Sequence, residues 1–167
     1  NAKMSDGVAL FHGNHRNLAG SGGVPSIDTL SAARSAMRTQ KDPDKKHALN
    51  IVPAYLIVPA ALETLARQYM DSPVDPTAER GHAINPVAGM ATVIADGRLD
   101  DHSATSWYLA ADPQRFDTVE VAYLNGNEQP FIEETTSWST DGVKIKVRIE
   151  AGVAPLDFRT FYKNPGV

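Results

Sequence analysis

Residues 49–70 read LNIVPAYLIVPAALETLARQYM, and this stretch combines the signals of a strand and of a helix. Its first half is rich in β-branched side chains, which favours a strand, but Pro53 divides it. We therefore expect either two short strand pieces or one edge strand with a break. Pro59 suits the first position of a helix that runs to about Met70. The buried side of that helix would carry Leu62, Leu65, Ala66 and Tyr69.

A second helix is expected nearer to the amino terminus. Before it, Val8–Phe11 is a short apolar run that predicts a strand, and residues 17–24 predict a flexible loop. Pro25 and Ser26 then begin the helix, because the Ser26 hydroxyl can accept hydrogen bonds from the free amides of the first turn. One apolar stripe defines its buried side: Ile27, Leu30, Ala33, Ala36 and Met37.

After Pro86 the apolar residues follow a period of two, which is typical of strands. The candidate strands are Ala91–Ala95, Ser106–Ala110, Thr118–Leu124, Phe131–Thr136 and Val143–Val153. Asn125-Gly126 predicts a hairpin between the third and fourth of them, and Asp141-Gly142 predicts a turn before the fifth. Two main helices followed by a mostly antiparallel sheet make the fold class α+β. The apolar residues of the tail, Pro155–Val167, should dock on the rest of the fold.

The composition argues against several classes of protein, including nucleic-acid-binding, disulfide-linked and membrane-spanning proteins. The chain has 167 residues, 42% of them hydrophobic and 22% charged, as in one soluble globular domain. Its net charge is −4 and no basic cluster stands out, which argues against a surface built to bind nucleic acid or anionic lipid. The absence of cysteine excludes disulfides and thiolate metal sites. The longest apolar run, residues 51–62, is too short to span a bilayer, so no membrane partner is expected.

His12 and His15 have the H-x-x-H spacing that can hold a metal when both lie on one helix face. Gly13, Asn14 and Asn17 argue against a helix here, and no third ligand lies at a diagnostic spacing. We therefore expect loop histidines that hydrogen-bond to the backbone. Residues 20–23, GSGG, match no phosphate-binding or nucleophile-elbow pattern, so we interpret them as a hinge.

Residues 100–103, DDHS, contain the residue types of a hydrolytic triad. Neighbours in the chain cannot form one, because triad groups converge from separated positions, so a polar loop is expected. In residues 143–149, VKIKVRI, apolar residues alternate with Lys144, Lys146 and Arg148, which predicts one dry face and one wet, cationic face. Such a row could meet phosphate, but it more often faces solvent or pairs with acids, here Glu133 and Glu134. We assign no catalytic, cofactor-binding or metal-binding residue and no cofactor.

Three stretches carry a family resemblance when they are taken in order. They are LFHGNHRNLAGSGG (10–23) with the helix that follows it to AMRTQKD (36–42), then NIVPAYLIVPAALETLARQ (50–68), and DGVKIKVRIEAGVAPLDFRTFYKNPG (141–166). They resemble the C-terminal part of a Mu-like phage major head subunit. They are most similar to the capsid half of prohead protease/major capsid fusion proteins of phages and prophages. The segment SATSWYLAADPQRFDTVEVAYLNGNEQPFIEE (103–134) matches the same family in order and character.

The resemblance implies a fragment of an HK97-type capsid fold. Asn1-Ala2 before Lys3-Met4 is typical of a tag remnant, and the rest of residues 1–24 would be a connector. Residues 25–48 would be a helix segment of the peripheral domain. Residues 49–136 would form the axial domain, and residues 137–167 the peripheral-domain strands and C-terminal tail. The N-terminal arm, extended loop and spine helix of the family should lie upstream, as should any protease module, and none of their residues can be assigned here.

The function implied is structural. The full-length protein would be a homo-oligomer that forms capsomer hexamers and pentamers and then a virion shell, assembled in the host cytoplasm. Packaged DNA would be enclosed without sequence-specific binding, and this fragment alone could be monomeric. We expect the loops at residues 71–85 and 97–103 near capsomer contacts or the capsomer axis. The alternatives are a metal-dependent or Ser/His hydrolase that uses His12, His15 or residues 100–102, and a small-molecule or peptide-binding α+β module with a large apolar cavity.

Overall fold

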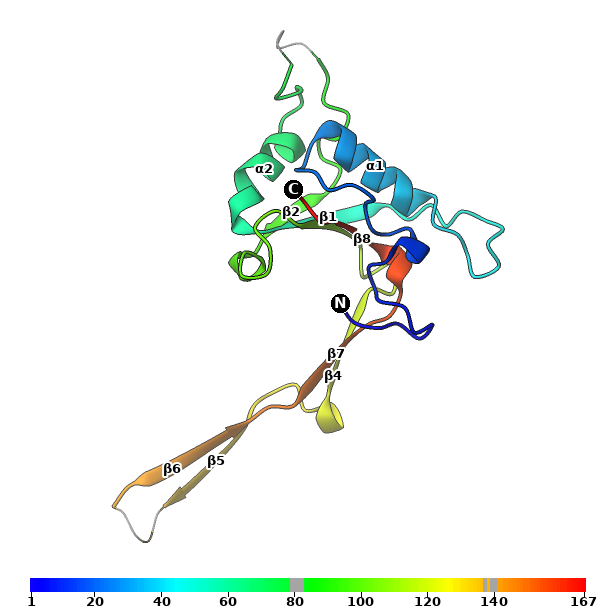
Figure 1. Cartoon of the computed structure of the whole chain (residues 1–167). Helices are drawn as coiled ribbons and strands as arrows, with labels where there is room; N and C mark the ends of the chain where they lie inside the picture. Colours follow the sequence, from blue (N-terminus) through cyan, green and yellow to red (C-terminus); the bar gives the residue numbers. More distant parts are fainter. Residues whose placement is uncertain (79–82, 137, 139–140) are drawn as a thin grey trace. The chain divides into compact units, whose positions relative to one another are not determined.

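The computed structural model describes residues 1–78, 83–136, 138 and 141–167 (Figure 1). The chain divides into two units, which are described separately. Unit 1 contains residues 1–118 and 155–167, and unit 2 contains residues 119–154. The axial and peripheral domain assignment stays a prediction, but unit 1 holds both the helix segment at residues 25–48 and the first strands of the expected axial domain.

Unit 1 is built on a four-stranded mixed sheet of order β2-β1-β3-β8. β1 (Pro53–Val58) runs parallel to β2 (Thr92–Ala95) and antiparallel to β3 (Trp107–Ala111), which pairs antiparallel with β8 (Phe161–Asn164). The expectation of an edge strand at residues 49–58 is wrong, because β1 has a partner on each side. Pro53 is tolerated there because it is the first residue of the strand, beside a shift in register.

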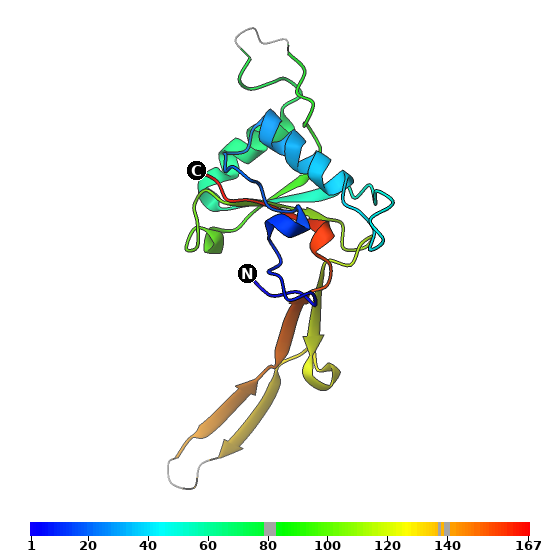
Figure 2. The same ribbon diagram turned by 45° about the vertical axis from the view of Figure 1, so that its right-hand side comes forward.

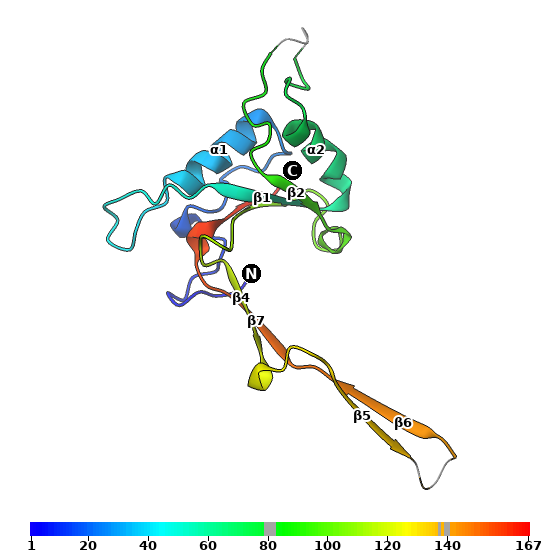
Figure 3. The ribbon, with the colours of Figure 1, turned by 180° about the vertical axis from the view of Figure 1, so that it is seen from behind.

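Both helices lie on one face of this sheet, as the three views agree (Figures 1, 2 and 3). α1 (Ile27–Arg38) begins as expected at Ser26, whose hydroxyl accepts the Thr29 amide in a reciprocal capping box. α2 (Glu63–Asp71) is preceded by a single 3₁₀ turn (Ala60–Leu62), so Pro59 precedes the helical residues instead of occupying the first helical position. Among the described residues, no helix is long and apolar enough to cross a membrane.

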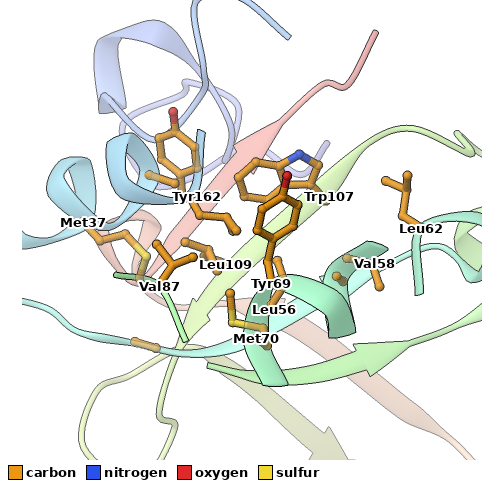
Figure 4. Close-up of a cluster of buried hydrophobic side chains, with 14 of the residues drawn as sticks. Met37, Leu56, Val58, Leu62, Tyr69, Met70, Val87, Trp107, Leu109 and Tyr162 are labelled. Atoms are coloured by element: carbon orange, nitrogen blue, oxygen red, sulfur yellow. The ribbon is translucent and has the colours of Figure 1, made fainter. Parts of the chain in front are cut away.

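The core lies between the two helices and the sheet (Figure 4). Trp107 and Leu109 of β3 are fully buried, and the Trp107 indole N–H donates to the carbonyl of Gly23 over 2.8 Å. The other large buried apolar side chains are Leu30, Met37, Ile51, Leu56, Val58, Leu62, Tyr69, Met70, Val87 and Tyr162. The apolar stripes predicted for both helices therefore contribute to one contiguous core.

The N-terminal segment and the tail are joined to unit 1 by backbone hydrogen bonds. Val8–Phe11 forms no strand, contrary to expectation, because only Ala9 makes an isolated bridge, with Lys3. Asn17 is buried, and its side-chain amide donates to the carbonyls of Leu10 (2.8 Å) and Phe158 (3.0 Å). The tail docks as predicted, since its strand β8 completes the sheet.

Unit 2 consists of two two-stranded sheets. β5 (Phe131–Thr136) pairs antiparallel with β6 (Val143–Arg148), and β4 (Val119–Tyr123) pairs with β7 (Ala151–Pro155). The hairpin expected at Asn125-Gly126 is therefore wrong: these residues form a turn, with φ of 55° and 71°, but the strands on either side have other partners. The single strand expected over residues 143–153 is two strands, because β6 and β7 pair with different neighbours.

Candidate assembly surface

His12 and His15 lie in one loop, where contacts within the chain occupy their rings. His15 is buried, its Nδ1 lies 3.0 Å from the Leu10 carbonyl oxygen, and its Nε2 lies 2.8 Å from Asp6 Oδ2. This hydrogen bond from His15 is the main cause that lowers the pKa of Asp6. Nδ1 of His12 accepts the amide of Asn14 over 3.1 Å. Within the described residues, no three His, Cys, Asp or Glu side chains gather as metal ligands.

The cluster at residues 100–103 shapes backbone turns. The Asp100 carboxylate accepts the amides of Ala60 (2.7 Å) and Ala61 (3.3 Å), which caps the 3₁₀ turn before α2. The Ser103 hydroxyl oxygen accepts the amide of Ser106 over 3.1 Å. Asp100 and Ser103 are thus directed at separate backbone amides, and in the part of the chain that the structure describes they do not converge as triad members.

The glycine run at residues 20–23 is a packing site. A Cβ on Gly22 would lie 1.5 Å from the carbonyl oxygen of Gly166, so only glycine fits without a shift of the backbone. The Gly23 amide donates to Asn164 Oδ1 over 2.9 Å. The expected hinge is therefore wrong at these two residues, which are fixed against the C-terminal segment.

The feature that sequence reasoning only half identified is the β5–β6 hairpin. Residues paired across an antiparallel ladder share a face of the sheet. One face carries four apolar side chains, hereafter the apolar face: Ile132, Val143, Ile145 and Val147. They are between 61% and 63% exposed. The dry side predicted from the VKIKVRI alternation exists as a pattern, but its four apolar side chains stay exposed among the described residues of unit 2.

The opposite face of the hairpin carries the cations Lys144, Lys146 and Arg148, and two of them have partners on that face. Lys146 lies opposite Glu133, with Nζ 3.8 Å from the carboxylate, as expected. The Arg148 guanidinium lies over the ring of Phe131 at 5.6 Å. Glu134 lies opposite Ile145, on the apolar face, so it is not the partner that the sequence suggested. With its charges partly balanced in this way, the cationic face has less need of an outside counter-ion.

Unit 2 has no core of its own. Not one of its described residues is buried, and Val121, Leu124 and Val153 add further exposed apolar area. A two-stranded hairpin is at best marginally stable in water, and soluble monomers rarely expose contiguous apolar surface of this kind. A partner packed against the apolar face would therefore add stability to this unit.

Comparison with known proteins identifies a family. A family model described as phage capsid protein matches residues 1–164 of the chain. No curated protein and no solved structure gave a significant match.

Proposed function

Because the chain belongs to the phage capsid protein family, we propose that it is a structural subunit of a tailed-phage or prophage capsid with an HK97-type fold. Its copies assemble into capsomers and then into a closed shell that encloses DNA, without catalysis. The family supports a structural subunit of the virion capsid. The Mu-like relationship and the origin in a prohead protease fusion belong to this proposal and rest on the ordered sequence resemblance.

The observation that carries the proposal is the apolar face of the β5–β6 hairpin. A shell subunit always has identical neighbours, so a surface that would be a liability in a monomer can be covered by the next copy. Burial of apolar area is the main favourable term in such contacts, at roughly 25 cal/mol per Å². We propose that a neighbouring copy covers the apolar face in the assembled particle.

In this proposal the axial and peripheral domains do not coincide with the two units, because unit 1 also holds the peripheral helix segment at residues 25–48. β6 and β7 belong to the peripheral strands expected from residue 137 onward, and their partners β5 and β4 extend that region back to residue 119. β1, β2, β3 and α2 of unit 1 belong to the axial domain, and β8 belongs to the peripheral tail. The loops at residues 71–85 and 97–103 stay assigned to the capsomer contacts, although residues 79–82 lie outside the described part of the chain.

The experiment is assembly in cells that express the coding sequence containing this chain. We expect the wild-type protein to sediment with shell-like particles in a density gradient and to show them by electron microscopy. Val147→Lys places a charge on the apolar face and should move the protein to slowly sedimenting species. Lys146→Gln, on the opposite face, is the matched control and should assemble. Wild-type protein that never enters particles would overturn the proposal.

A further inference from the structure

Unit 1 contains a second feature, on which the assembly proposal does not draw. A cleft of about 590 Å³ lies between the loop at residues 14–16, the end of α1 with the turn after it, and residues 158–159. Four cationic side chains line it: Arg16, Lys41, Lys45 and Arg159. We call it the basic cleft.

The positive charge in the basic cleft is largely uncompensated. Asp42 is the acidic residue of its lining, and one oxygen of that carboxylate accepts the backbone amide of Lys46 over 2.8 Å. Arg159 pairs with Asp157 at 3.1 Å. Arg16, Lys41 and Lys45 form no ion pair within the described part of the chain. These cations converge from separate segments of a chain whose net charge is −4.

The floor of the cleft is held in place by stacking and hydrogen bonds. The ring of Phe158 lies against His15, with centroids 3.9 Å apart and planes 9° apart, and the Arg159 guanidinium lies over the same ring at 4.4 Å. Arg159 Nε also donates to the Lys41 carbonyl over 2.9 Å. Because His15 and Arg159 already contact the Phe158 ring, the cleft offers little aromatic surface for a planar base and presents mainly cations.

Backbone conformation marks the same cleft independently. Arg16 and Lys45 have φ of 54° and 59°, in the left-handed region that side chains other than Asn, Asp and Gly seldom adopt. The other described non-glycine residues with positive φ are Asn50 and Asn125, both of the tolerant type. Two cations are therefore kept in a strained conformation where Asn or Gly would fit more easily, and both line the cleft. Arg16 ends the 3₁₀ turn Gly13–His15, and the Lys45 amide donates to the Asp42 carbonyl, so these turns place both cations at the cleft.

We propose that the basic cleft binds phosphate groups, either free or in the backbone of a nucleic acid. Several lysine and arginine side chains around one hollow suit a compact anion with more than one charge and several acceptor oxygens. A single carboxylate would leave most of these cations without a partner. The contacts are to phosphate alone, so they carry no base sequence preference.

The test measures binding of inorganic pyrophosphate by calorimetry and of a short mixed-sequence DNA duplex by fluorescence anisotropy. Arg16→Asn and Lys45→Asn remove a cation each and suit the left-handed backbone, so each variant should unfold at the same temperature as the wild type or higher. Their double variant should bind pyrophosphate roughly tenfold more weakly or worse, since each lost contact is charge-assisted. Lys46→Asn removes the same charge one residue away, outside the lining, and should bind nearly as the wild type does.

The two probes separate the sources of phosphate. Binding of both, with a salt dependence for DNA that falls in the double variant, assigns the cleft to nucleic acid backbone. Binding of pyrophosphate alone assigns it to free phosphate. The proposal is overturned if neither probe binds, if the double variant binds like the wild type, or if an oligoglutamate of equal charge binds as tightly as pyrophosphate. Failure here leaves the assembly proposal untouched, because that proposal rests on the apolar face of unit 2 and not on the basic cleft.

Discussion

At the scale of single residues, close backbone packing holds the segment before α1 against the C-terminal residues. Gly22 meets Gly166, and the neighbouring Gly23 accepts the Trp107 indole N–H and donates to Asn164. A run that reads as flexible in sequence is thus one of the tightest contacts of unit 1. Composition cannot distinguish a glycine kept for flexibility from one kept for space, because the partner is at the other end of the chain.

Gly22→Ala should destabilise the protein, because the added methyl group overlaps the Gly166 carbonyl. Overpacking of this kind costs typically about 1–3 kcal/mol of unfolding free energy. Gly20→Ala is the control in the same run, since a Cβ there meets nothing within 4 Å. Urea denaturation followed by tryptophan fluorescence measures both. Equal stability of the two variants would mean that the segment is a hinge after all.

Asp96 makes the stability of the folded protein depend on pH, and its lowered pKa fixes the direction of that dependence. Its hydrogen bond with the Arg98 side chain lowers the pKa of Asp96 from the ordinary 3.8 to about 2. Because the folded-state pKa is below the unfolded one, the contribution to stability is complete above pH 3.8 and is lost as pH falls toward about 2. Thermal melts of wild type and Asp96→Asn should therefore differ most above this window and converge within it. A difference that stays constant down to pH 2 would contradict the assignment.

At the scale of elements, the sequence predicted the features that depend on residues close together in the chain, such as the cap of a helix. α1 was predictable because its cap and its apolar stripe both lie within the segment. The position of β1 inside the sheet, and the break between β6 and β7, were not predictable from the segments themselves. Both depend on which distant strand is the partner: β1 has one on each side, and β6 and β7 have different ones.

Ser26→Ala tests the contribution of the α1 cap. The Ser26 hydroxyl accepts the Thr29 amide, and the Thr29 hydroxyl lies 2.9 Å from the Ser26 amide nitrogen. Loss of an N-cap hydroxyl typically costs about 1 kcal/mol. Ser35, an exposed residue inside the same helix, is the matched control, and Ser35→Ala should leave the urea midpoint unchanged or slightly higher. A neutral Ser26→Ala would show that packing of the stripe alone maintains the helix.

At the scale of the whole molecule, the chain combines a unit with a core and a unit without one. Alternation in residues 143–149 predicted a strand with an apolar side, but no single sequence states what covers that side. The basic cleft could not be predicted from the sequence for a related reason. Its four cations are at residues 16, 41, 45 and 159, and they come together only in the folded protein. The sequence therefore contains no basic cluster, but the structure does.

The central claim is that neighbouring copies cover the apolar face in assembled particles, and thiol labelling tests it most directly. The chain has no cysteine, so Ile145→Cys and Lys144→Cys each introduce a single thiol, on the apolar and on the opposite face of β6. Purified particles of each variant are treated with a maleimide, and the labelled fraction is compared with that of dissociated protein. We predict that assembly protects the thiol of Ile145→Cys and leaves that of Lys144→Cys reactive. Equal labelling of Ile145→Cys before and after assembly would contradict the account.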